Sequence, residues 1–134
     1  MSAAALPWLQ AVAVAAGAAV GGLLRWRAGL WLNATWAGFP LGTLFVNCVG
    51  GLLIGASLAW FEQWPSELWR LLVVTGLLGG LTTFSAFSAE VVTLLLRKEW
   101  LWGSIAIGSH VLGSVAMTIA GIVLVRGLYA WSGS

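Results

Sequence analysis

The sequence predicts an all-α integral membrane protein, with four transmembrane helices that form a single domain over residues 1–134. Hydrophobic residues make up 60% of the chain and charged residues only 7%, whereas about 25% of residues are charged in a typical soluble domain. The few charges separate long uncharged runs. The ten tryptophans lie near the ends of these runs or between them, as expected of rings that prefer the headgroup interface.

The uncharged runs locate the four helices, because a helix needs about 20 residues to cross the hydrocarbon core. We expect the helices at residues 4–24, 40–61, 70–96 and 101–125. The third span is the least regular, since it contains a Gly- and Thr-rich interruption and the acidic residue Glu90. Four spans place both chain termini on one side of the membrane.

The basic residues give little information on orientation. Four of them lie in the connections after the first and third spans, and two, Arg70 and Arg126, lie on the opposite side. The difference favours a cytoplasmic location for the first group, and its small size also permits insertion in both orientations. No Lys or Arg precedes Arg25, so the sequence predicts no signal peptide.

Glycine pairs recur at four-residue spacing in the first three spans, at Gly17 and Gly21, Gly51 and Gly55, and Gly76 and Gly80. This spacing lets helix backbones approach closely in lipid, and packing alone is the favoured interpretation for the first pair. Four short helices do not easily enclose a pore and still seal against lipid. We therefore expect a homo-oligomer, most simply a dimer.

The second span carries Thr43, Asn47 and Gly51 at four-residue intervals, which place them on one face of a helix. An amide that faces lipid is costly, so Asn47 is expected to point into the protein. Two interpretations stay open: the amide joins two helices by hydrogen bonds, or its NH₂ donates to an anion. Cys48, the single cysteine, is expected to act as a small buried hydrophobic residue.

The third span contains Gly79 and Gly80, followed by Thr82 and Thr83, a pattern that predicts an interruption of the helix. The first half then ends with unpaired carbonyl groups, and this negative end of the helix dipole suits a small cation. Broken membrane helices often serve ion sites in this way. The alternative is a packing kink stabilised by the threonine side chains.

Phe84 and Phe87 lie on one face of the helix that resumes after the interruption, beside Ser85 and Ser88. Phenyl rings are electropositive at their edges, so two rings presented edge-on would contact a small anion without gripping it tightly. By spacing alone, simple packing is the more common role of two such residues.

Three ionisable residues lie within spans or at their ends. Glu90 is the only acid deep in a span and is a functional candidate on that ground, although its position also lets it reach interfacial water. His110 shares a face of the fourth span with Ser114, and a satisfied core histidine is the common alternative. Arg25, which closes the first span, either reaches the headgroups or attracts anions to a pore mouth.

The sequence contains no arrangement typical of an enzyme: no nucleophile–base pair, no phosphate-binding loop and no His/Cys cluster with the spacing of metal ligands. The formal net charge of +2 is too small to indicate nucleic-acid binding. We expect neither an enzyme nor a partner of nucleic acid.

Two segments resemble the Fluc (CrcB) family of fluoride channels. Residues 42–50, Gly-Thr-Leu-Phe-Val-Asn-Cys-Val-Gly, are similar to its second-helix pattern G-T-L-x-V-N-x-x-G. Residues 79–90, Gly-Gly-Leu-Thr-Thr-Phe-Ser-Ala-Phe-Ser-Ala-Glu, are similar to its pattern G-G-x-T-T-F-S-T-F-S-x-E. Residues 21–26 resemble the basic end of its first helix. The length and the number of spans also agree with the family, so the resemblance covers essentially the whole chain.

The resemblance implies a passive, fluoride-selective channel of the cell (inner) membrane that exports fluoride and relieves its toxicity. It implies an antiparallel, dual-topology homodimer with two fluoride pathways, one on each side of a structural Na⁺. The Na⁺ ligands would be main-chain carbonyls of Gly79 and Thr82 from both subunits. Its partners would be fluoride, the lipid bilayer and a second copy of the chain.

The resemblance also assigns the fluoride pathway. Phe84 and Phe87 would line each pore, with Asn47 as the amide donor near them. A polar track would continue along Thr43, Ser85, Ser88, His110 and Ser114, with Arg25 near a vestibule and Glu90 on the outer track. Ala86 departs from the family pattern, which has Thr there, and this change removes a hydroxyl from the path.

Two other functions are compatible with four membrane spans. A small multidrug-type proton-coupled exporter is also dimeric, but such exporters carry an essential Glu in the first helix, and here the first span contains no acid. A structural subunit that packs by its glycines would leave the Gly/Thr interruption and the clustered hydroxyls unexplained.

Overall fold

The computed structural model describes residues 6–35 and 38–132, and these residues include four helical spans long and apolar enough to cross a membrane. The spans are Pro7–Leu32, Leu41–Gln63, Glu67–Leu96 and Trp100–Trp131. The predicted membrane fold is therefore confirmed, although residues 4 and 5 of the first predicted span lie outside the described residues.

The first, second and fourth spans are single helices, whereas the third span is built from four segments. The continuous helices are α1 (Pro7–Leu32), α2 (Leu41–Gln63) and α6 (Trp100–Ser132). The third span consists of α3 (Glu67–Arg70), the wider helical segment η1 (Leu71–Leu78), α4 (Gly79–Leu81) and α5 (Phe84–Leu96).

The first and last helices run about two turns past the ends expected from charge. In α1 the Arg27 guanidinium lies over the Trp31 ring, 4.9 Å from its centroid. In α6 the Arg126 guanidinium forms an ion pair with Glu62 of α2 at 2.8 Å. Long basic side chains reach out of the hydrocarbon along the helix surface, so a charge marks the membrane edge without ending the helix.

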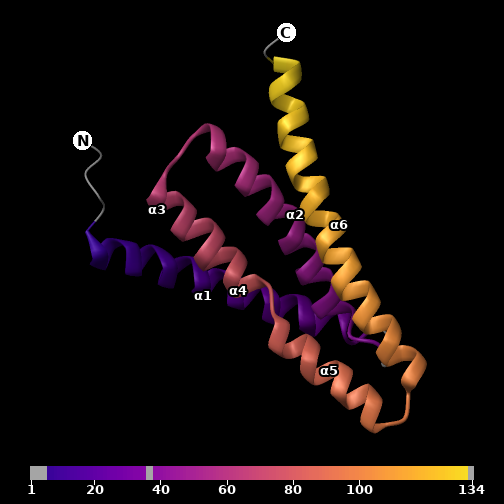
Figure 1. Ribbon diagram of the computed structural model, residues 1–134. Helices are drawn as coiled ribbons and strands as arrows, with labels where there is room; N and C mark the ends of the chain where they lie inside the picture. Colours follow the sequence, from indigo (N-terminus) through magenta and orange to yellow (C-terminus); the bar gives the residue numbers. More distant parts are fainter. Residues whose placement is uncertain (1–5, 36–37, 133–134) are drawn as a thin grey trace.

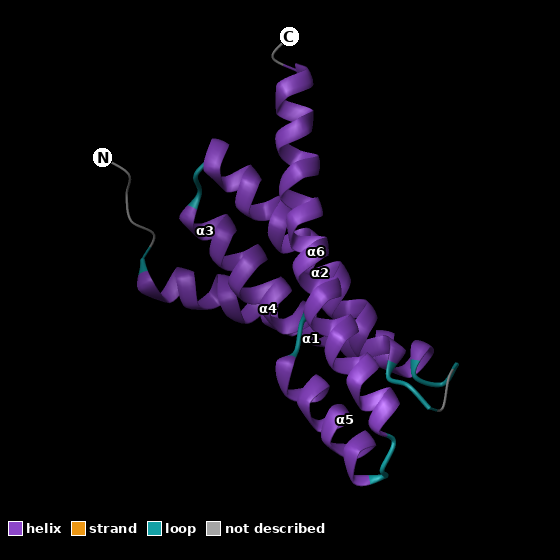
Figure 2. Cartoon of the chain, turned by 45° about the vertical axis from the view of Figure 1, so that its right-hand side comes forward, coloured by secondary structure: helices purple, strands orange, loops and turns teal. Residues whose placement is uncertain are grey.

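The helices pack in pairs. Helix α1 lies along η1 and α4, α2 lies along α6, and α5 lies beside the beginning of α6 (Figures 1 and 2). Glycines permit the close approach: a Cβ at Gly76 would stand 2.7 Å from the Val14 carbonyl oxygen, and one at Gly51 would stand 2.8 Å from that of Ser114. The predicted glycine contacts between helices are thus confirmed.

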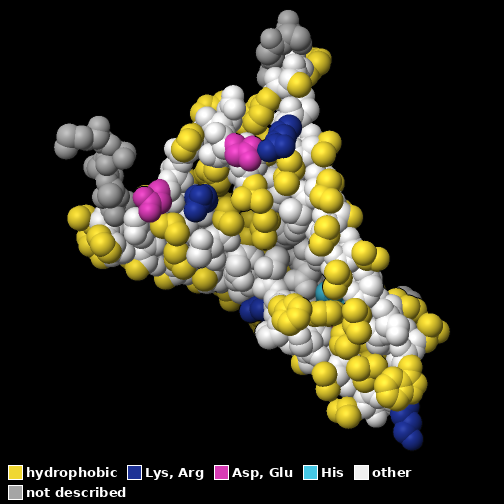
Figure 3. Space-filling model, in the orientation of Figure 1, with side chains coloured by type: hydrophobic (Ala, Val, Ile, Leu, Met, Phe, Trp, Pro, Cys, Tyr) yellow, Lys and Arg dark blue, Asp and Glu magenta, His cyan; other side chains and the backbone are white. Residues whose placement is uncertain are grey.

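The protomer buries little of its apolar surface. The side chains of Leu96 and Leu112 are 79% and 72% exposed, and Figure 3 shows apolar side chains spread over the face in view, with few charges among them. The buried residues form two small clusters, one around Phe87 and Leu94 and one around Val46 and Leu78. The exposed apolar surface is suited to lipid or to another membrane-embedded chain.

No sequence pattern predicts η1. The backbone of Leu71–Leu78 forms wide turns with i→i+5 hydrogen bonds, and the Gly79 N–H continues this pattern to the Val74 carbonyl. Such turns occur often at functional sites. Here they lead directly into the interrupted part of the span.

The interruption lies at Thr82 and Thr83, whose backbones are extended, with φ/ψ of −84°/155° and −154°/122°. Gly79 and Gly80 stay helical, which corrects the expectation that they take part in the break. Gly80 serves packing instead, because a Cβ there would stand 2.6 Å from the Ala18 carbonyl oxygen.

Candidate functional site

Asn47 of α2 supplies the hydrogen-bond partners that the interrupted helix lacks. The Thr83 N–H donates to Asn47 Oδ1 at 2.8 Å, and Asn47 Nδ2 donates to the Thr83 carbonyl at 3.0 Å. The Thr83 hydroxyl then caps α5 by accepting from the Ala86 N–H at 3.1 Å. The break is therefore a bonded structure held by side chains from two spans.

The break leaves the end of α4 rich in carbonyl oxygens. In a continuous helix the Thr83 N–H would donate to the Gly79 carbonyl, but here it donates to Asn47. Gly79 is exposed on the protomer surface, and the C-terminal end of a helix is electronegative. No cluster of three or more His, Cys, Asp or Glu residues exists in the described parts of the chain.

Three aromatic rings stand in a row beside the break. Phe84 and Phe87 meet edge to face, with centroids 5.5 Å apart and an interplanar angle of 61°. The Phe87 ring stacks on the His110 imidazole of α6 at 4.5 Å and 28°. Phe87 is buried, whereas the Phe84 side chain is 77% exposed. The row therefore runs from the interior of the protomer to its surface.

A cavity of about 570 Å³ brings most of the predicted residues together. Its walls contain the ring pair, the break and polar residues of α2 and α6, among them Asn47, Gly79, Thr82, Phe84, Phe87, His110 and Ser114. His110 is only 4% exposed, and its Nδ1 lies 3.1 Å from Asn47 Nδ2. The cavity thus combines aromatic rings with hydrogen-bonding groups at the interrupted part of the span.

A second cavity, of about 430 Å³, joins Arg25, Thr43, Glu90 and Ala86. The buried Thr43 hydroxyl donates to Glu90 Oε1, while Glu90 Oε2 is buried with no hydrogen-bond partner among the described residues. Thr83 lines both cavities. Thr83, at the break, therefore lies between a cavity with charged residues and one with the phenylalanine pair.

Two predicted residues line neither cavity, namely Ser85 and Ser88. The Ser85 hydroxyl lies 3.2 Å from that of Thr83, and the Ser88 hydroxyl donates to the Phe84 carbonyl at 2.9 Å. Both hydroxyls are thus engaged within the break and the first turn of α5, beside the cavities.

Asn33 and Thr118 are polar residues of the cavity walls that were not predicted from the sequence. Asn33 lines the second cavity and accepts from the Gly42 N–H at 2.8 Å. Thr118 lines the first cavity, and its hydroxyl donates to the Ser114 carbonyl at 2.9 Å. Thr118 lies four residues after Ser114, so extending the polar face of the fourth span by one turn would have found it.

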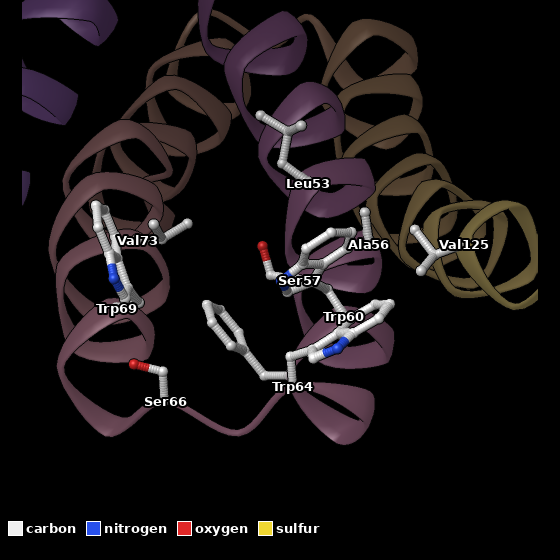
Figure 4. A pocket seen from close by; sticks show the side chains of 10 residues that line it. Leu53, Ala56, Ser57, Trp60, Trp64, Ser66, Trp69, Val73 and Val125 are labelled. Carbon is white, nitrogen blue, oxygen red and sulfur yellow. The ribbon is translucent and has the colours of Figure 1, made fainter. Parts of the chain in front are cut away.

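A third cavity, of about 550 Å³, lies apart from these residues. It is mostly apolar and lies between α2 and the α3–η1 segment, with Trp60, Trp64 and Trp69 around it (Figure 4). None of the predicted site residues lines it. Its tryptophans lie at span ends, as expected at a membrane interface, and its walls offer little to an ion.

Comparisons with known proteins identify close relatives. Residues 12–122 match the family described as CrcB-like protein, Camphor Resistance (CrcB). The fluoride-specific ion channel FluC of Pseudomonas aeruginosa is 52% identical over 117 residues, which cover 86% of this chain and 92% of that protein. The FluC of Erwinia tasmaniensis is 51% identical over 120 residues, covering 88% and 96%. That of Thiobacillus denitrificans is 56% identical over 109 residues, covering 80% and 88%.

Proposed function

The chain belongs to the CrcB-like family, and we propose that it is a fluoride-selective channel through which fluoride passively leaves the cell. It is a multi-pass protein of the cell membrane and not an enzyme. The observation that carries the proposal is the cavity in which the Phe84 and Phe87 rings meet polar side chains of α2 and α6 at a broken helix.

The chemistry of this cavity suits fluoride. The ion is small and strongly hydrated, so several successive contacts must offset the loss of its water. Electropositive ring edges and neutral hydrogen-bond donors supply such contacts. Each contact is weak enough for the ion to leave again, which conduction requires.

The two cavities form one pathway. Arg25 attracts the anion to the cavity that also holds Thr43 and Glu90, and the ion then passes Thr83 to reach the phenylalanine pair. His110 and Ser114 continue the polar wall beyond the rings. Ser85 and Ser88 support the wall from beside it through their bonds to Thr83 and Phe84.

The channel is an antiparallel homodimer with two pathways. Support comes from the exposure of Phe84, since a phenyl ring that is 77% exposed in the protomer can serve a pore only when a second chain covers it. The slight difference in basic residues between the two sides of the membrane permits the opposite orientations that this dimer needs.

We further propose a structural Na⁺, which main-chain carbonyls of Gly79 and Thr82 from both subunits would hold. The oxygens at the end of α4 fit a hard cation, and the Gly79 carbonyl lacks its helical partner because Asn47 binds the Thr83 N–H. Gly79 is exposed, as a ligand shared between subunits must be. The ion would neutralise the two helix ends that meet there.

Fluoride release from liposomes that contain only this protein tests the function. We expect rapid efflux once a potassium ionophore balances the charge, and little efflux before, because a passive channel moves net charge. A proton-coupled exporter would instead need a proton gradient. Efflux that appears only with such a gradient would contradict the channel assignment.

A further inference from the structure

The orientation of the Asn47 amide is fixed by two backbone groups. The Thr83 N–H can only donate, so the amide atom 2.8 Å from it must be the oxygen. The Thr83 carbonyl can only accept, so the amide atom 3.0 Å from it must be the nitrogen. The NH₂ group has one further hydrogen, and the remaining neighbour of Nδ2 is His110 Nδ1 at 3.1 Å.

This contact determines the tautomer of His110. Because Asn47 Nδ2 has no lone pair to offer, His110 Nδ1 must accept, and a neutral imidazole with an accepting Nδ1 carries its proton on Nε2. A charged imidazole would direct a second donor at the amide and lose this bond. Asn47 therefore holds His110 as a neutral ring with its N–H on the far side.

The role of His110 Nε2 is not explained by the contacts described so far. This nitrogen is buried and has no hydrogen-bond partner among the residues that the structure describes. A buried donor without a partner is costly, and His110 lines the cavity next to the Phe87 ring, on which it stacks. Nε2 is therefore a donor beside the aromatic pair that nothing in the described protomer satisfies.

We propose that the His110 Nε2–H is the hydrogen-bond donor that fluoride meets beside Phe84 and Phe87, and that Asn47 is its positioning residue. The inference rests on the proposed function and refines it, because it transfers the role of anion donor from the Asn47 amide to the imidazole. The hydrogen atoms of the Asn47 amide are already used by Thr83 and His110.

The tautomer can be measured directly, because the chain contains a single histidine. We expect ¹⁵N NMR of histidine-labelled protein in bilayers to show a protonated Nε2 and a bare Nδ1. Fluoride should shift the Nε2 resonance, and chloride at the same concentration should not. In Asn47→Asp, whose carboxylate accepts hydrogen bonds, Nδ1 should become protonated. A proton on Nδ1 of the unaltered protein, or an Nε2 signal that ignores fluoride, would overturn the proposal.

A pair of variants tests the donor by flux. His110→Gln keeps an N–H donor on a side chain of similar reach, whereas His110→Phe keeps a ring that can stack on Phe87 and removes the donor. Loss of a hydrogen bond to a charged partner predicts a flux about ten- to a hundredfold lower in His110→Phe. His110→Gln should retain clearly more flux than His110→Phe. Equal flux from both variants would refute the donor role. If unaltered liposomes released no fluoride at all, the proposed function itself would fail, whatever the tautomer.

Discussion

Replacing Asn47 by Leu, which has a similar volume and no polar atoms, removes the side chain that completes the broken helix. The buried Thr83 then keeps an N–H and a carbonyl without their partners at 2.8 and 3.0 Å. Each buried backbone group left unsatisfied costs about 1–3 kcal/mol. The two together predict a loss of about 2–6 kcal/mol in the free energy of unfolding.

The loss can be measured by denaturant unfolding in detergent micelles, followed by the fluorescence of the ten tryptophans. Ser57→Ala is a matched control, since it removes a polar group from the same helix outside the site. The control should change the free energy of unfolding by less than about 1 kcal/mol. If Asn47→Leu cost no more than this control, Asn47 would not be what holds the interruption.

Three further variants or conditions test other parts of the account. Gly21→Ala should destabilise the protein by about 1–3 kcal/mol in the same unfolding assay, because its Cβ would overlap the Leu77 carbonyl. Gly22→Ala is the control: its Cβ meets nothing within 4 Å, so it should be neutral. Equal effects of the two variants would contradict the observed packing of α1. Phe84→Ile and Phe87→Ile should each lower fluoride flux at least about tenfold while the dimer survives on size-exclusion chromatography, because an aliphatic side chain has no electropositive edge; near-normal flux from both would return the two rings to simple packing. Replacing sodium by a large organic cation should weaken the dimer or abolish conduction, and identical assembly and flux without sodium would count against the site at Gly79 and Thr82.

The membrane fold was predictable because it follows from the amino-acid composition and from the distribution of apolar and charged residues along the chain. Bilayer thickness sets the length of an apolar run, and tryptophan marks its ends, so four spans follow from hydrophobicity and charge. The helix ends were less predictable. Arg27 and Arg126 stay within helices because their long side chains find partners in Trp31 and Glu62, and such partners depend on the tertiary structure.

The sequence predicted that the third span is interrupted, but not which residues leave the helical conformation. Glycine and threonine together indicated a break, but the glycines stay helical because α1 presses against Gly80. The extended residues are the threonines, held by an amide from another span. The wide turns of η1 had no signal, since Leu71–Leu78 is an ordinary apolar run.

The site residues were found more readily than their roles. Spacing left Asn47 balanced between joining helices and donating to an anion, and the protomer shows the first of these, with its bonds to Thr83 and His110. The serines beside the phenylalanines appeared equivalent to them in the sequence, yet they line neither cavity. The role of Asn47 depends on contacts between helices, and no local sequence pattern records them.

The most direct test of the central claim compares two anions in the same liposomes. Protein reconstituted alone should release fluoride rapidly under charge balance, and chloride efflux under identical conditions should stay at the level of protein-free liposomes. Chloride released as readily as fluoride would contradict the assignment of a fluoride-selective channel.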